Sequence, residues 1–214
     1  MQNKLFDLNG YTDLPSGKVA TIVTYLEMRA RPLLAAAERP DLSLERVTQA
    51  DLSDYRRLFR EIGEDWLWFG RLVLDDEELS RLLAEPTREL YLPRKNGKAV
   101  GMLELDFQDP RNVELAYFGL VPDAIGGGAG RWLMARALEL VWSRPATERF
   151  WVHTCTADSP QALGFYRSVG FAPYKRAIEI ADDPREAGLM PESAAPHLPF
   201  IPTGERPDEP EAHS

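Results

Sequence analysis

The sequence contains only one cysteine, Cys155, among its 214 residues. A single cysteine excludes an intrachain disulfide and a cysteine-based zinc site, so we expect no structural metal. The chain also lacks an apolar run long enough to span a bilayer and an N-terminal signal peptide. We therefore expect a cytoplasmic protein that does not insert into membranes.

Positive charge is also scarce, because 25 lysines and arginines face 34 aspartates and glutamates, for a net charge of −9. Binding to nucleic acids or to anionic membranes needs clustered lysine and arginine. We expect neither as a partner. The negative net charge instead hints at a cationic amine as the substrate. The length and the ordinary hydrophobic content favour one domain with extensions.

Composition divides the chain into three parts. Residues 1–40 form an N-terminal extension that carries one alternating strand at 18–28. Residues 41–180 form the main domain. Residues 181–214 are a proline-rich tail, in which an extended strap could pack on the domain or on a second subunit, and a homodimer stays open. The last ten residues, 205–214, read as a mobile acidic end.

The main domain reads as strands followed by alternating helices and strands. That order predicts an α/β fold with a mixed sheet and helices on both faces. Strands are expected at 42–47, 89–93, 99–107, 113–121, 150–155 and 177–180, and helices at 52–63, 75–84, 128–144 and 160–169.

A glycine-rich loop follows the strand at 113–121 and leads directly into a helix. Four of the five residues at 126–130 are glycine, which favours a concave row of N–H groups at a helix N-terminus, a binding site for phosphate. The loop is not a P-loop, since Arg131 and Trp132 replace the required lysine and hydroxyl residue, and it is not a dinucleotide fingerprint, since Arg131 stands where the third glycine would be. A glycine-rich turn without a ligand is the alternative.

Two motifs resemble those of one family. Ile125-x-x-Gly128-x-Gly130 is similar to the pyrophosphate loop of the GNAT acyl-CoA N-acyltransferases, Gln/Arg-x-x-Gly-x-Gly/Ala. Residues 158–171 resemble the family's second signature, Asn-x-x-Ala-x-x-x-Tyr-x-x-x-Gly-Phe, with Asp158 in place of the Asn and one additional residue before Ala162. The resemblance implies a mostly antiparallel GNAT-type sheet, acetyl-CoA as co-substrate, and direct acetyl transfer to a primary amine in a ternary complex.

The resemblance also implies where acetyl-CoA binds. The contacts would come from the end of the strand, from the loop and from the second motif. Phe118 would offer its N–H to the acyl carbonyl, with Gly119 permitting a bulge, and Arg131 would pair with the pyrophosphate. The implied residues are Phe118, Leu120, Val121, Ile125, Gly126, Gly127, Gly128, Ala129, Gly130, Arg131, Asp158 and Tyr166.

Acyl transfer to an amine needs a base and an acid. Glu114, eleven residues before Ile125, matches the position of the general base in related histone acetyltransferases, and Tyr166 matches the tyrosine that protonates the leaving thiolate. A solvated carboxylate and a tyrosine that only packs in the core are the respective alternatives. Glu104 and Asp106 are the reserve bases.

The acceptor region is expected between the first two helices, where Trp66, Trp68 and Phe69 could form an aromatic wall, with Glu104 as a further substrate-binding residue. A structural plug between the helices is the alternative. His153 reads as a structural histidine rather than a relay, and Cys155 as inert. A GNAT fold that binds acyl-CoA without catalysis, as a sensor or interaction module, is the alternative function.

Overall fold

The computed structural model describes residues 9–35 and 37–204, which are built around an eight-stranded sheet. Every neighbouring pair of strands is antiparallel except β6 and β7, which are parallel, as predicted for a mixed and mostly antiparallel sheet. The short β4 (Lys98–Ala99) pairs only with β3. The other strands lie in the order β2 (Leu42–Val47), β3 (Arg88–Lys95), β5 (Gly101–Asp106), β6 (Asn112–Leu120), β7 (Arg149–Cys155), β1 (Lys18–Met28) and β8 (Ala172–Asp182).

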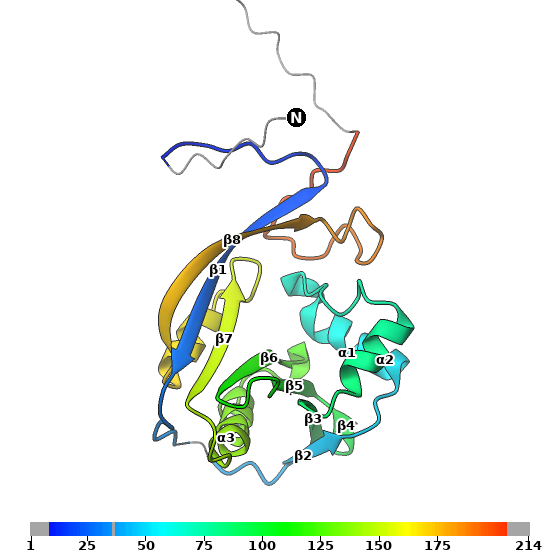
Figure 1. The fold of residues 1–214 in the computed structure, drawn as a ribbon. Coiled ribbons are helices and arrows are strands. Elements are labelled where there is room, and N and C mark those ends of the chain that lie inside the picture. Colours follow the sequence, from blue (N-terminus) through cyan, green and yellow to red (C-terminus); the bar gives the residue numbers. More distant parts are fainter. Residues whose placement is uncertain (1–8, 36, 205–214) are drawn as a thin grey trace, which may run out of the picture.

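Helices cover both faces of the sheet, which confirms the predicted layering. The helices α1 (Leu52–Gly63) and α2 (Asp76–Leu83) contribute to one hydrophobic core, whereas α3 (Ala129–Trp142) and α4 (Ala162–Ser168) contribute to another. Figure 1 shows α1 and α2 together, well apart from α3. Two 3₁₀ turns, η1 (Glu64–Trp66) and η2 (Pro122–Ala124), follow α1 and β6. The sheet therefore separates an α1 face from an α3 face.

The helices on the α1 face begin where side chains satisfy their free N–H groups. The Asp51 side chain accepts a hydrogen bond of 2.9 Å from the N–H of Asp54 at the start of α1. A reciprocal capping box between Asp75 and Glu78 starts α2. Acidic caps also suit the positive end of the helix dipole, so both helix starts follow from local sequence.

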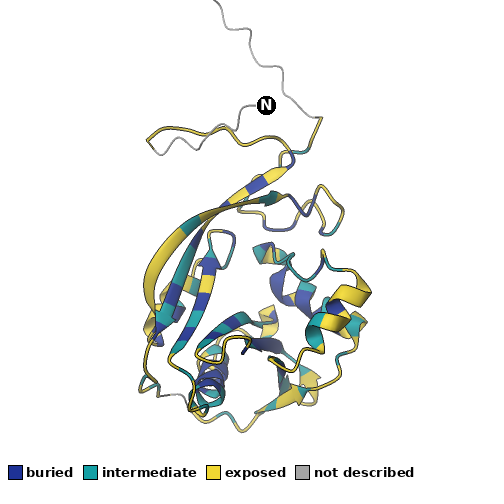
Figure 2. Cartoon of the chain, in the orientation of Figure 1, coloured by how far each residue is buried: buried dark blue, intermediate teal, exposed yellow. Residues whose placement is uncertain are grey.

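The N-terminal strand β1 lies inside the sheet, between β7 and β8 (Figure 1). Its bounds, Lys18–Met28, are those that the sequence predicts. Leu26 is fully buried in the core of the α3 face, and Val19 is buried in the core of the α1 face. Because β1 provides a long partner, β8 runs over Ala172–Asp182 rather than over the predicted 177–180, and Figure 2 shows it exposed along most of its length.

The proline-rich tail folds back on the domain as far as it is described. Arg185 is almost completely buried and donates to the Asp183 carboxylate at 2.7 Å and to the carbonyl of Leu198 at 2.9 Å. Ala195 donates its N–H to the carbonyl of Glu64 in η1 at 3.2 Å. The tail is thus a strap packed on the domain, while the expected mobile end at 205–214 lies outside the described residues.

No helix in the described ranges is long and apolar enough to cross a membrane.

Candidate active site

The parallel strands β6 and β7 pair over three positions only, and the last of these joins Glu114 to Trp151. Beyond it the two strands separate. In the same region the pairing of β6 with β5 shifts, since Glu104 pairs with Tyr117 and Leu105 with Leu115. Ala116 is therefore the extra residue of a β-bulge in β6. Such a bulge bends its strand, here at the point where β6 separates from β7.

The bulge lies at Ala116 and not beside Gly119, so that detail of the sequence prediction is wrong. Gly119 has another role, because a Cβ there would lie 2.4 Å from the Ile62 side chain and 2.9 Å from that of Trp68. The glycine lets α1 and the following loop approach β6 closely.

The backbone of β6 leaves donors facing the opening. Val121 donates its N–H to the Val100 carbonyl beside β5 at 3.0 Å. Successive N–H groups of a strand point to opposite edges, so those of Phe118 and Leu120 point toward β7, where β6 is no longer paired. The Phe118 N–H is thereby available to an acyl carbonyl.

A pocket of about 300 Å³ occupies the gap between the separated strands. Its lining includes Phe118 and Tyr166, which pack with the core of the α3 face, and Tyr117, Trp68 and Cys155, which pack with the core of the α1 face. The pocket therefore passes through the sheet. A ligand bound from the α3 face can meet a second ligand bound from the α1 face.

The glycine loop lies on the α3 side, at the N-terminus of α3. Gly126, Gly127 and Gly128 all have left-handed backbones, with φ of 98°, 55° and 82°. Gly128 is the N-cap and contributes no side-chain hydrogen bond, so no side chain caps the helix end. A Cβ on Gly126 or Gly128 would meet nothing within 4 Å, which leaves room above the loop for a ligand.

The segment before β2 contacts this loop and the start of α3 through two arginines, one on each side of the contact. Arg131 donates from Nε to the Ala35 carbonyl at 3.0 Å, so this nitrogen of the expected phosphate ligand is already in use. Arg39 donates to the Gly127 carbonyl at 2.6 Å and to the Asp41 carboxylate at 2.8 Å. Sequence reasoning missed Arg39, because its contact joins residues 88 positions apart.

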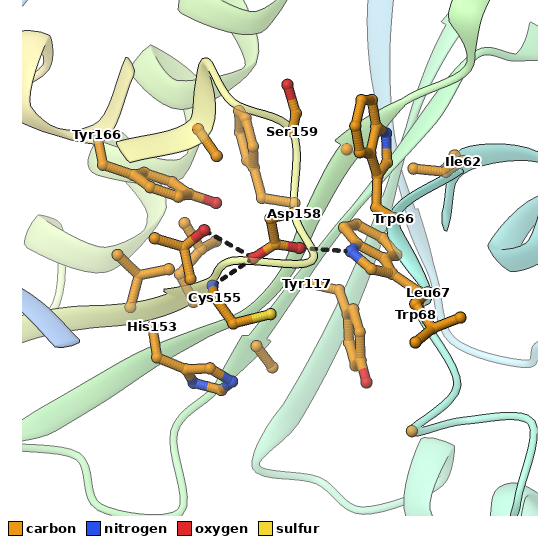
Figure 3. A pocket seen from close by; sticks show the side chains of 18 of the residues that line it. Ile62, Trp66, Leu67, Trp68, Tyr117, His153, Cys155, Asp158, Ser159 and Tyr166 are labelled. Atoms are coloured by element: carbon orange, nitrogen blue, oxygen red, sulfur yellow. Dashed lines mark hydrogen bonds between the residues drawn. The ribbon is translucent and has the colours of Figure 1, made fainter. Parts of the chain in front are cut away.

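Asp158 connects the two sides of the pocket (Figure 3). One carboxylate oxygen accepts a hydrogen bond from Trp68 Nε1 at 3.0 Å, and the other accepts from the Thr154 hydroxyl at 2.6 Å and the Cys155 N–H at 2.8 Å. The residue predicted to contact the cofactor thus has three protein donors. It ties the loop after α1 to the end of β7.

Tyr166 has its ring in the core and its hydroxyl directed toward the middle of the pocket (Figure 3). The ring packs edge-on to Phe118 and Phe171, with centroids 6.4 Å and 5.8 Å away. Burial, together with the negative charge of Asp158, raises the pKa of the Tyr166 hydroxyl. The phenol therefore holds its proton, as a general acid must before it acts.

Glu114 lies at the point where β6 and β7 separate. Its side chain is 24% exposed and approaches His153 Nδ1 at 3.7 Å. Burial raises the pKa of the Glu114 carboxyl, and the neighbouring His153 opposes that shift in part. His153 lines the pocket and Glu114 does not, so the histidine stands between the pocket and the carboxylate.

Glu104 lies outside the pocket, contrary to the prediction that it binds substrate. It is fully buried and accepts hydrogen bonds from Arg71 at 2.6 Å, Arg88 at 2.8 Å and Tyr55 at 2.9 Å. Asp106, the other reserve base, pairs with Arg88 at 2.5 Å. These carboxylates belong to an ion-pair network inside the protein and are not accessible to an acceptor.

The predicted aromatic residues all line the pocket. Trp66, Trp68 and Phe69 surround its α1 side. Trp68 also packs against Phe59 at a centroid distance of 5.6 Å, so it acts as a structural plug as well as a wall. Cys155 lines the pocket too, and burial raises the pKa of its thiol, which disfavours the nucleophilic thiolate.

Of the predicted cofactor residues, Phe118, Leu120, Ile125, Asp158 and Tyr166 line the pocket. Val121 is buried and packs with the core of the α1 face, so it is not available to the cofactor. The described residues contain no group of His, Cys, Asp and Glu side chains arranged to hold a metal ion.

Residues 51–171 match the model of the acetyltransferase (GNAT) family. No curated protein matches the sequence. Among solved structures, a functionally unknown conserved protein from Staphylococcus epidermidis shares 13% identity at a TM-score of 0.57, with 78% of this chain and 64% of that one covered. A GCN5-related N-acetyltransferase from Sphaerobacter thermophilus shares 13% identity at a TM-score of 0.56, with 76% and 52% covered. This chain thus spans less than two thirds of the length of either protein, and the likeness is one of fold.

Proposed function

The chain belongs to the GNAT acetyltransferase family, and from that premise we propose that it transfers an acetyl group from acetyl-CoA directly to a primary amine in a ternary complex. The observation that carries the proposal is the pocket that passes through the sheet between β6 and β7. The glycine loop lies on one side of it and the aromatic wall on the other.

On the α3 side, we assign the glycine loop and the N-terminus of α3 to the pyrophosphate of acetyl-CoA. The left-handed glycines leave the space above the loop free of side chains. The Phe118 N–H, directed into the opening, would donate to the thioester carbonyl and stabilise the negative charge that develops on its oxygen.

On the α1 side, Glu114 would receive the proton of the incoming ammonium, through His153 or a bridging water. A carboxyl with a raised pKa suits this task better than an ordinary one, because its proton affinity lies closer to that of its partner. The free amine then forms the C–N bond as the C–S bond breaks. The Tyr166 hydroxyl gives its proton to the leaving thiolate and is reprotonated, through water, by the second proton that the nitrogen loses as it becomes an amide.

A calorimetric titration with acetyl-CoA tests the cofactor site, and Gly128→Val with Gly97→Val provides a matched pair. Both glycines have left-handed backbones, with φ of 82° and 77°, and a Cβ on either meets nothing within 4 Å. The backbone cost is therefore similar, roughly 1–2 kcal/mol. Only the loop variant should lose acetyl-CoA binding.

Retained binding by Gly128→Val, or equal losses in both variants, would contradict the assignment of the loop. Thiol release from acetyl-CoA in the presence of primary amines then tests catalysis. Binding without release for any amine would favour an acyl-CoA sensor of the same fold.

A further inference from the structure

The end of the pocket on the α1 face includes a carboxylate that the proposed reaction does not use. Glu179 of β8 lines the pocket together with Trp66, Phe69, His153 and Cys155. It pairs with Thr21 of β1, and alternation along β1 places Thr21 on the same face as Val19, which packs in the core of the α1 face. Glu179 therefore belongs to the side from which the acceptor enters.

The Glu179 carboxylate is exposed, and no described residue forms a hydrogen bond or an ion pair with it. Lys175 lies on the same face of β8 but about 13 Å away along the strand, as the rise per residue gives. Its ammonium is 4.6 Å from the centre of the Tyr25 ring, and it does not line the pocket. The negative charge of Glu179 is thus not neutralised nearby.

The rest of the described lining favours a cation as well. It includes no lysine and no arginine, and its other carboxylate, Asp158, is occupied by three protein donors. Trp66 and Phe69, on the wall after α1, line the pocket as well, and the faces of aromatic rings attract positive charge. A cation on this side of the pocket thus meets no lysine or arginine among the described lining residues.

We propose that Glu179 forms a subsite for a second positive charge, and that the natural acceptor is a diamine-type molecule, in which one amine is acetylated while another cationic group binds Glu179. This inference rests on the proposed function, because it takes the same pocket as the acceptor site. It narrows the acceptor from any primary amine to one with two separated cationic groups.

Three acceptors of equal chain length isolate the effect of the second group. Butylamine ends in a methyl group, 1,4-diaminobutane in an ammonium and 4-aminobutanoate in a carboxylate. We expect kcat/KM for the wild-type enzyme to be highest with the diamine and lowest with the amino acid. Glu179→Gln should lower the ratio of diamine to butylamine by about fivefold, the size of one partly exposed charge interaction.

Glu85→Gln is the matched control, since Glu85 is also exposed and lies outside this pocket. It should leave the ratio unchanged. Glu179→Lys should reverse the order of the diamine and the amino acid. Melting temperatures of the three variants verify that each is folded, and an exposed site should tolerate all of them.

Two results would overturn the subsite while leaving the proposed function intact. One is a wild-type enzyme that prefers butylamine or does not distinguish it from the diamine. The other is an equal effect of Glu179→Gln on all three acceptors.

If none of the three amines is acetylated, the proposed function fails for this class, and calorimetry on the protein with CoA decides the inference separately. Tighter binding of the diamine than of butylamine, lost in Glu179→Gln, would support the subsite. Equal binding would overturn it.

Discussion

Glu114 is partly buried and lies near His153 on the neighbouring strand, while the charges of Asp106, Arg88 and Arg71 act on it more weakly. Because burial raises the pKa of its carboxyl, a larger share of Glu114 is protonated at mildly acidic pH than for an ordinary glutamate. A base must be deprotonated, so we expect kcat/KM of the wild-type enzyme to rise with pH through this pKa. Glu114→Gln should reduce kcat/KM by about 100-fold above this pKa, the typical contribution of a general base, and by less at lower pH, where the wild-type carboxyl is itself protonated. A pH–rate profile of both proteins tests this, and an unchanged profile would move the base to water or to another group.

Although Glu114→Gln should lower activity, we expect it to raise the stability of the folded protein at neutral and alkaline pH. A carboxyl whose pKa is higher in the folded than in the unfolded protein lowers the free energy of unfolding as the pH rises from the unfolded pKa through the folded one. Glutamine resembles the protonated form and does not suffer this loss. Glu114→Gln should therefore melt at a higher temperature than wild type at pH 8 and at a similar temperature below pH 4. Equal melting temperatures at pH 8 would contradict the cost of burying this charge.

Tyr166 separates a packing role from a chemical one, since its ring lies in the core and its hydroxyl faces the pocket. Tyr166→Phe preserves the ring. We expect kcat at saturating substrates to fall about 100-fold, as for loss of a general acid, with acetyl-CoA affinity unchanged. Tyr174→Phe, at an exposed tyrosine of β8, is the control. An unaffected kcat would assign Tyr166 to packing alone.

At the scale of elements, β1 lies outside the residues that match the family but inside the sheet. Substitutions in β1 therefore measure how much this strand contributes to the stability of the fold. Leu26 is fully buried between β7 and β8, whereas Ile22 on the same strand is 42% exposed. Leu26→Ala should lower the free energy of unfolding by about 2–5 kcal/mol, and Ile22→Ala by less than about 1 kcal/mol. Urea denaturation measures both. Similar costs for the two variants would mean that β1 is only loosely attached.

The sequence predicts most elements well where local signals agree. Alternation set the bounds of β1 and β2, and capping residues located α1 and α2 to within a residue or two at each end. The insertion of β1 between β7 and β8 was not predictable, because pairing partners are chosen by tertiary packing. For the same reason Glu104 looked accessible in the sequence, although Arg71 and Arg88 from distant segments enclose it.

At the scale of the whole molecule, the pocket depends on three parts of the chain. The family match supplies the opening between β6 and β7, β8 supplies Glu179, and the tail supports η1 from outside. His197 of the tail packs its ring 5.9 Å from that of Trp66 and contacts the Ala157 carbonyl at 3.0 Å. The division into an extension, a domain and a tail stays a prediction from composition. In the structure the extension adds β1 to the sheet and the tail packs on η1, so all three parts contribute to one structure around the pocket.

The last prediction concerns this support from the tail. Arg185→Met removes the cation that holds Asp183 and the carbonyls of Ala194 and Leu198, and it leaves a buried carboxylate without its partner. We expect a loss of about 3–5 kcal/mol in the free energy of unfolding. In the molecules that remain folded, the looser η1 should raise KM for the amine, while the affinity for acetyl-CoA on the opposite side stays the same. Arg176→Met, at an exposed arginine of β8, is the control and should change neither. Parallel losses for both substrates would mean that the tail stabilises the fold in general, whereas a selective loss would make it part of the acceptor site.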